Sequence, residues 1–195
     1  MSVEIKALRG KEIEPWLNDF AALRMTVFRD WPYLYDGSFA YEREYLKPYL
    51  ADPTAVVVGA FDKGKMIGAA TASALSGHKA DFAEAFKGHP MSLERVYYLA
   101  ESVLLPDYRG QGIGHRFFDH REEAAKAQGF GTTAFCAVLR PQSHLLRPQG
   151  ARSLEPFWRG RGYEPLDGVI ARFNWQDVGE AQETEKELQF WARTS

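Results

Sequence analysis

One short segment constrains the fold of this 195-residue chain more than any other: the glycine-rich run R-G-Q-G-I-G at residues 109–114. It follows an apolar segment at residues 96–105, typical of a central strand, which Pro106 ends. It precedes an amphipathic segment at residues 112–128 that predicts a helix. Glycines let a backbone turn tightly and approach a ligand, and the first N–H groups of a helix have no acceptor within it. The sequence therefore predicts a helix N-terminus suited to hold phosphate.

The spacing of these glycines is a poor match to two common phosphate-binding loops. A Walker loop reads GxxxxGK[ST], and the chain has no such string. A dinucleotide-binding fingerprint reads GxGxxG early in a βαβ unit, whereas Gly110, Gly112 and Gly114 give GxGxG late in the chain. A turn that only packs the strand against the helix is the alternative without a ligand.

Composition excludes several classes of protein. The 24 Lys and Arg against 26 Asp and Glu give a net charge of -2, so no bulk positive field exists to hold a nucleic acid or an anionic membrane. The single cysteine, Cys136, excludes an internal disulfide and a zinc ribbon. The apolar run at residues 55–61 is far shorter than the roughly 20 residues that span a bilayer. We expect no metal site, no nucleic-acid or membrane partner, and a cytoplasmic location.

The rest of the chain predicts strands and helices without a repeat or a linker. Runs at residues 55–61 and 66–75 favour a hairpin, whereas the strand, helix and strand within residues 96–138 form a βαβ unit with a parallel pair. Further helices are predicted at residues 11–30, 41–50, 81–87 and 154–161, and further strands at residues 3–8, 169–175 and 187–192. Residues 177–187 are rich in acidic side chains and are predicted to be a solvated connection.

The segment L-L-P-D-Y-R-G-Q-G-I-G at residues 104–114 resembles the acetyl-CoA-binding motif of the GNAT N-acetyltransferase superfamily, R/Q-x-x-G-x-G/A after a strand that ends near a proline. The order of the predicted elements is similar to that family over residues 3–175. The resemblance implies an α/β (α+β) fold, with a mixed, mostly antiparallel sheet, a central parallel strand pair and flanking helices. It also implies a single N-acetyltransferase domain over residues 1–195.

Acetyl-CoA, as acetyl donor, is the cofactor that the resemblance implies. The motif strand and its parallel neighbour would splay apart, so that pantetheine pairs with exposed backbone of residues 103–105, and the pyrophosphate would sit on amides of residues 111–114. The implied cofactor-binding residues are Val103, Leu104, Leu105, Arg109, Gly110, Gln111, Gly112, Ile113 and Gly114.

Glu101 is the only carboxylate in the apolar strand, and strand alternation places it on the face of Leu99 and Val103. Burial without a partner would cost several kcal/mol, so Glu101 must reach a partner, water or a substrate. An amine must lose a proton before it attacks a thioester, and we expect Glu101 to act as the base. An ion pair with a nearby arginine is the structural alternative. The glutamate that some family members carry on this strand would fall near Tyr98, on the opposite face.

Many family members have a tyrosine, one residue after a phenylalanine on the short helix, that protonates the leaving sulfur. In this chain Trp158 follows Phe157, so the thiolate leaves unaided or another hydroxyl serves, and we name Tyr98 as the candidate, with Tyr163 as the other option. The asparagine often found after the next strand is replaced by a longer loop at residues 140–152.

Seven aromatic side chains lie within residues 31–49, and such a wall suits an amphipathic or cationic acceptor. We expect Tyr33 and Tyr35 to bind the substrate, while core packing of the aromatic side chains is an equal alternative. Five arginines follow later in the chain and could hold the 3′-phosphate of CoA, hold an acidic acceptor or form a solvated face: Arg140, Arg147, Arg152, Arg159 and Arg161.

These observations predict transfer of an acetyl group from acetyl-CoA to a primary amine, on a small molecule or a peptide, by direct attack. Two other readings stay open: a non-catalytic acyl-CoA-binding module, and a dinucleotide-binding protein. A homodimer is one option for the assembly. Cys136 lies in a predicted buried strand and is expected to be a core residue and not a nucleophile.

Overall fold

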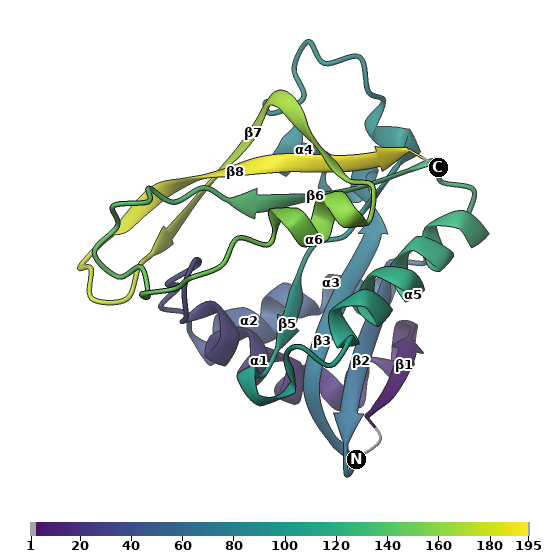
Figure 1. The fold of residues 1–195 in the computed structure, drawn as a ribbon. Coiled ribbons are helices and arrows are strands. Elements are labelled where there is room, and N and C mark those ends of the chain that lie inside the picture. Colours follow the sequence, from purple (N-terminus) through teal and green to yellow (C-terminus); the bar gives the residue numbers. More distant parts are fainter. Residues whose placement is uncertain (1–2, 195) are drawn as a thin grey trace.

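The computed structural model describes residues 3–194 as a mixed α/β fold around one eight-stranded sheet (Figure 1). All neighbouring strands are antiparallel except β4 and β6, which are parallel. This is the mostly antiparallel sheet with a parallel pair that the sequence predicts. The strands follow the spatial order β1 (Glu4–Leu8), β2 (Val56–Asp62), β3 (Lys65–Ala74), β4 (Val96–Tyr98), β6 (Thr132–Val138), β8 (Glu183–Thr194) and β7 (Glu164–Gln176), while β5 (Ser102–Leu104) pairs with β3.

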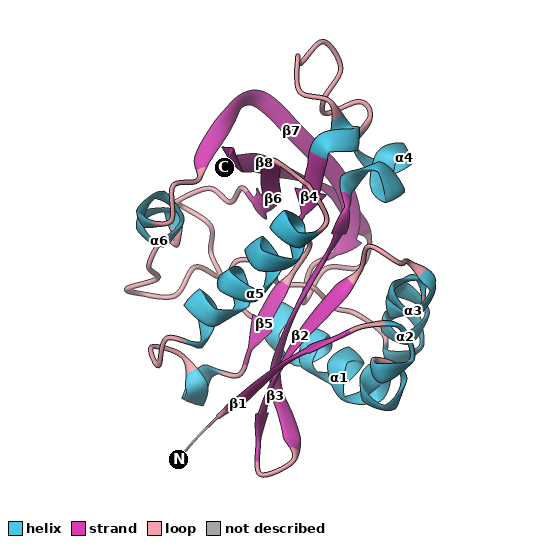
Figure 2. Cartoon of the chain, turned by 90° about the vertical axis from the view of Figure 1, so that its right-hand side faces the viewer, coloured by secondary structure: helices cyan, strands magenta, loops and turns pink. Residues whose placement is uncertain are grey.

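Helices cover both faces of this sheet (Figure 2). The long helix α5 (Ile113–Ala127) and the short α6 (Glu155–Gly160) pack on one face, in a core that includes Phe117 and Trp191. On the other face, α1 (Leu17–Phe28), α2 (Phe39–Leu46) and α3 (Pro48–Ala51) cover the N-terminal strands, and α4 (Lys79–Phe82) covers the C-terminal ones. Within residues 3–194, no helix is long and apolar enough to cross a membrane.

Prolines account for two differences from the predicted helices. The helix predicted at residues 41–50 is divided into α2 and α3, because Pro48 has no N–H to continue the first helix and occupies the first turn of the second. The helix predicted from residue 11 begins at Leu17, after two 3₁₀ turns, and Pro15 lies in the second of these turns.

The closing strands are longer than predicted, and the expected solvated connection at residues 177–187 is wrong in part. β7 extends to Gln176 and β8 begins at Glu183, so only residues 177–182 connect them. Asp177 is 3% exposed because it pairs with two cations, Arg140 and Lys186. Alternation of charged and apolar residues in β8 reflects a strand and not a loop.

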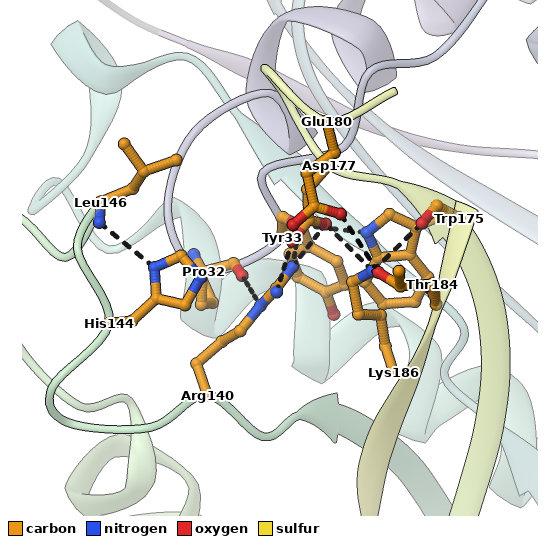
Figure 3. A network of polar contacts seen from close by, with 10 residues as sticks. All are labelled: Pro32, Tyr33, Arg140, His144, Leu146, Trp175, Asp177, Glu180, Thr184 and Lys186. Atoms are coloured by element: carbon orange, nitrogen blue, oxygen red, sulfur yellow. Dashed lines mark hydrogen bonds and ion pairs between the residues drawn. The ribbon is translucent and has the colours of Figure 1, made fainter. Parts of the chain in front are cut away.

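Arg140 and Asp177 join three distant segments of the chain (Figure 3). Arg140 Nη1 lies 2.6 Å from Asp177 Oδ2, and Lys186 Nζ lies 3.4 Å from Asp177 Oδ1. Arg140 also donates to the carbonyl oxygens of Pro32 at 2.9 Å and Tyr33 at 2.6 Å. The guanidinium is therefore engaged within the protein, neither solvated nor free to hold a phosphate. These bonds fix the loop between α1 and α2 against the β7–β8 turn.

We predict that Asp177 stabilises the fold in a pH-dependent way. Burial raises the pKa of the Asp177 carboxyl, but hydrogen bonds and charge from Arg140 and Lys186 outweigh burial and hold it below its usual 3.8. A carboxyl whose pKa is depressed on folding stabilises the fold above its unfolded pKa, and this stabilisation is lost as the pH falls through the folded pKa. Asp177→Asn should lower the free energy of unfolding by about 3 kcal/mol at pH 7, and less below pH 4 (measured by urea unfolding).

The exposed pair of Arg159 and Glu164 provides the matched control. Glu164→Gln should change the free energy of unfolding by less than about 1 kcal/mol, because solvent screens exposed pairs. Equal effects of the two substitutions at pH 7 would contradict the role given to Asp177.

Candidate active site

The glycine-rich run forms an open cradle at the N-terminus of α5. Gly110 and Gly112 have φ values of 75° and 78°, which L side chains rarely adopt, and Gly112 is the N-cap of the helix. A Cβ atom placed on either glycine would meet nothing within 4 Å. The N–H groups of Ile113, Gly114 and His115 have no acceptor within the helix. The protein's own atoms therefore leave space beside Gly110 and Gly112, and the unbonded N–H groups of the helix start suit an anion.

Two side chains of the same run turn back onto the protein. Arg109 Nε donates to the Leu104 carbonyl at 3.2 Å, and Gln111 Nε2 donates to the Asp107 carbonyl at 3.1 Å. Both bonds brace the turn from within, so the backbone amides are what the cradle presents to a ligand.

Next to the cradle, β5 and β6 diverge (Figure 1). β4 pairs with β6 up to Tyr98 and Ala134, and the Leu99 amide still donates to the Ala134 carbonyl at 2.8 Å. Beyond that point β5 pairs with β3 alone, while β6 continues to Val138. The two strands of the predicted parallel pair thus leave an unpaired backbone edge on β5.

Only some of the predicted backbone groups lie on this open edge. The Leu105 amide donates to the Ile67 carbonyl at 3.0 Å, and Val103 pairs with Ala69, so both residues face β3. By the alternation of an antiparallel ladder, Ser102 and Leu104 direct their backbone groups to the open edge. Of the three residues expected to bind pantetheine, Leu104 alone is so placed, and Ser102 is a residue that sequence reasoning missed.

A β-bulge separates β4 from β5 and changes which side chains share a face. Ser73 pairs with Tyr98 and Ala70 pairs with Ser102, so residues 71 and 72 of β3 lie opposite three residues, 99 to 101. As a result, Leu99 packs in the α5 core, while Glu101 faces α1. The expectation that Glu101 shares a face with Leu99 is wrong, because one extra residue reverses the alternation.

The bulge also brings Tyr98 and Glu101 to the same face, where the unbroken alternation placed them on opposite faces. Tyr98 packs with Phe82 of α4, on the side of the sheet away from α5. Glu101 lies on that side too, 2.7 Å from the guanidinium of Arg24 on α1. Sequence spacing alone gives no sign of this arrangement.

Arg121 of α5 holds the bulge from the opposite face. Its Nη1 donates to the carbonyl oxygens of Glu101 at 3.1 Å and Thr71 at 3.3 Å, and its Nη2 donates to Ser102 Oγ at 2.9 Å. Burial lowers the pKa of this guanidinium to about 10, and the side chain is 1% exposed. These bonds satisfy carbonyls at the irregular point of the strand.

Glu101 is buried and paired, yet one of its oxygens remains free. Its Oε2 lies 2.7 Å from Arg24 Nη1 and accepts a hydrogen bond from the Tyr45 hydroxyl at 3.3 Å. Its Oε1 is buried and has no hydrogen-bond partner. The ion pair with an arginine, which was the structural alternative for Glu101, is present. It leaves Oε1 of Glu101 as an acceptor for a further partner.

Arg24 joins Glu101 to a second buried carboxylate, Glu42 of α2. Its guanidinium lies 4.2 Å from the centroid of the Tyr45 ring. Burial lowers the pKa of Arg24, but the charges of Glu101 and Glu42 outweigh burial and raise it, so the guanidinium stays charged. Sequence reasoning missed Arg24 and Glu42, whereas Tyr45 belongs to the aromatic wall predicted at residues 31–49. Arg24 and Glu42 could have been noticed as charged residues on helix faces that otherwise carry apolar side chains, four residues before Phe28 and Leu46.

Tyr98 and Cys136 form a buried pair beside this cluster. The Tyr98 hydroxyl lies 3.3 Å from Cys136 Sγ. Burial raises the pKa of Tyr98 well above its usual value and that of the Cys136 thiol to about 12. Both groups are therefore protonated at neutral pH, and the buried thiol is not a nucleophile.

The other hydroxyl considered as an acid, that of Tyr163, lies elsewhere. Tyr163 packs with Phe118 in the core beneath α5, on the opposite face of the sheet from Glu101. Its hydroxyl is engaged by Thr133 at 2.8 Å and Glu122 at 2.9 Å. The Tyr163 hydroxyl therefore lies away from the side chains of Glu101 and Arg24.

Tyr33 and Tyr35, the predicted substrate-binding residues, lie around the same cluster. The Tyr33 ring packs on Phe28, with centroids 4.6 Å apart. Burial raises the pKa of Tyr33, and the charge of Glu101 adds to this effect. Tyr35 is half-buried, and burial together with the nearby charge of Glu42 raises its pKa. Both tyrosines are thus neutral at neutral pH.

Comparison with known proteins agrees with this geometry. The sequence model of the acetyltransferase (GNAT) family matches residues 17–147, whereas no curated protein matches the chain by sequence. The ribosomal-protein-alanine N-acetyltransferase of Brucella melitensis superposes with a TM-score of 0.64 at 14% identity, over 98% of this chain and 99% of its own.

Two further solved structures match the whole chain. The PaiA N-acetyltransferase of Thermoplasma acidophilum, solved in complex with coenzyme A, gives a TM-score of 0.56 at 16% identity, over 100% of both chains. The polyamine N-acetyltransferase of Drosophila melanogaster gives 0.64 at 10% identity, also over 100% of both chains. At such identities the likeness shows the fold, and the sequence match shows the family. The chain belongs to the GNAT acetyltransferase family.

Proposed function

We propose that residues 1–195 form one N-acetyltransferase domain that transfers an acetyl group from acetyl-CoA to a primary amine. The observation that carries this proposal is the open cradle at the N-terminus of α5, next to the unpaired edge of β5. Family membership and the coenzyme A complex of a structural neighbour support it. In the acceptor, the amine belongs to a small molecule or a peptide.

The backbone around the glycine-rich run would hold the cofactor. Amides of residues 111–114 would hold the pyrophosphate, because the positive end of the helix dipole is at the same point and the space beside Gly112 is open. The β5 edge at Ser102 and Leu104 would pair with pantetheine. Acetyl-CoA supplies an activated acetyl thioester to this site.

Glu101 would remove the proton that a primary amine, with a pKa of about 10, carries at neutral pH. Its Oε1 is the atom without a partner, so it can accept a proton while Oε2 stays paired with Arg24. The Leu104 amide would donate to the thioester oxygen as charge develops on it. The new C–N bond forms as the C–S bond breaks, and the nitrogen then gives up its second proton. The sulfur leaves as thiolate, with that proton going to solvent, or it takes the proton of the Tyr98 hydroxyl, which the second proton of the amine restores. Tyr33 and Tyr35 would contact the acceptor.

A non-catalytic acyl-CoA-binding module is the second candidate. The observation that favours it is Trp158, at the place where many family members have a tyrosine acid. Its ring packs against Trp191 at 5.2 Å and Phe135 at 5.0 Å, and an indole N–H is not a usable acid. Release of free thiol in the presence of amines separates the two candidates.

Gly112→Glu tests where the cofactor lies. A carboxylate there would project into the open cradle and repel the diphosphate, so the Kd for acetyl-CoA should rise at least about 100-fold, as calorimetry measures. Gly129→Glu is the matched control, because Gly129 has φ 80° and open space at the other end of the same helix. Both substitutions strain the backbone by about 1 kcal/mol, but only the first should weaken binding. An unchanged Kd in Gly112→Glu would refute the placement.

Glu101→Gln tests the base. The amide keeps the size of the side chain but cannot take a proton, so kcat should fall by about 10²–10⁴-fold. The Kd for acetyl-CoA should stay within about threefold of the original value, since Glu101 faces α1 and not the cradle. A variant with full kcat would remove Glu101 from the reaction.

A further inference from the structure

Glu42 and Glu101 each have one oxygen without a partner. Glu42 of α2 is 0% exposed and Glu101 is 8% exposed, and both carboxylates contact the guanidinium of Arg24 through Oε2. The remaining oxygens, Glu42 Oε1 and Glu101 Oε1, are buried and accept no hydrogen bond. Since buried polar atoms in folded proteins are almost always hydrogen-bonded, two such atoms next to one cation indicate a missing donor.

Charges around the pair point to a cation as that donor. Among the side chains that the structure describes, Arg24 is the only cation within ion-pair distance of either carboxylate, so two negative charges share one direct positive partner. Arg121 lies on the other face of the strand and donates to carbonyl oxygens and Ser102 Oγ, with no carboxylate among its partners. A primary ammonium group has three N–H donors and one positive charge, so it complements the two oxygens without partners and the remaining negative charge.

Tyr45 contacts one member of the pair and also lines a cavity of about 310 Å³. Its hydroxyl donates to Glu101 Oε2. The residues that line the cavity include Asp52, Asp81, Tyr49 and His78, with no Lys or Arg among the lining residues given by the structure. Such walls accept a neutral or cationic chain and repel a carboxylate.

We propose that Glu42 is a binding residue of the acceptor site, which takes primary amines with a neutral or cationic tail. The free oxygens of Glu42 and Glu101 receive the ammonium group, and the tail extends past Tyr45 into the cavity. Glu42 binds the amine before and during the reaction, whereas Glu101 takes the proton. This inference rests on the proposed acetyltransferase function, since it assigns the acceptor of that reaction.

Three probes of equal chain length test the acceptor class: n-butylamine, 1,4-diaminobutane and 4-aminobutanoate. Thiol release from acetyl-CoA should give a kcat/KM at least about tenfold higher for the first two, because only the third brings a carboxylate to acidic walls. Comparable or higher kcat/KM for 4-aminobutanoate would overturn the acceptor class.

Glu42→Gln tests the residue itself. Loss of a charge-assisted hydrogen bond made equally to bound substrate and transition state should raise the KM for 1,4-diaminobutane about 10–100-fold and leave kcat within about threefold. Glu44→Gln is the matched control on the same helix, since Glu44 is exposed and pairs with Lys47, and it should change neither constant. An unchanged KM in folded Glu42→Gln, checked by thermal unfolding, would overturn the role of Glu42.

Calorimetry separates failure of this inference from failure of the proposed function. Binding of 1,4-diaminobutane to the CoA-saturated protein should be measurable, and 4-aminobutanoate should bind at least about tenfold more weakly. Absence of acetyl-CoA binding would refute the proposed function. Normal acetyl-CoA binding without selective binding of the diamine would refute the inference alone, and this readout stands even if Glu42→Gln does not fold.

Discussion

The extra residue between β4 and β5 is the constraint on which the site depends. Without it, Glu101 would point into the core beneath α5, with Leu99 and not with Arg24. The same irregularity marks the place where β5 leaves β6 and exposes its backbone edge. Arg121 fixes this point by donating to the carbonyls of Thr71 and Glu101. A buried cation on one face of the sheet therefore helps to position the Glu101 side chain on the other face.

Much of the fold follows from periodicity in the sequence. The strand, glycine turn and helix around residues 96–128 were predictable, because apolar runs, Pro106 and positive-φ glycines each have a local structural cause. The bulge was not predictable from the sequence. One added residue does not change the apolar composition of the strand, but it reverses which side chains share a face. The sequence therefore marks Glu101 as unusual and places it correctly with Val103, but not relative to Leu99 and Tyr98.

Contacts between distant parts of the chain account for the other features that the sequence did not predict. Arg24 and Asp177 are each buried by an opposite charge that lies far away in sequence, and the acidic residues that follow Asp177 suggest an exposed position. Composition could not show that the loop carrying Tyr33 is fixed by Arg140, since that contact joins segments separated by 107 residues. Charged residues on the apolar faces of helices were the available signal, and they mark the buried ion cluster.

The central claim is that backbone amides at the cradle and on the β5 edge hold a coenzyme. The most direct measurement is a titration of ¹⁵N-labelled protein with coenzyme A, followed by amide chemical shifts. If these amides hold the coenzyme, the largest shifts occur at Leu104, Gly112 and Gly114, and the amide of Gly129 at the far end of α5 does not shift. Saturable binding without a change in the chemical shifts of these three amides, or with changes confined to other surfaces, would contradict this placement of the coenzyme.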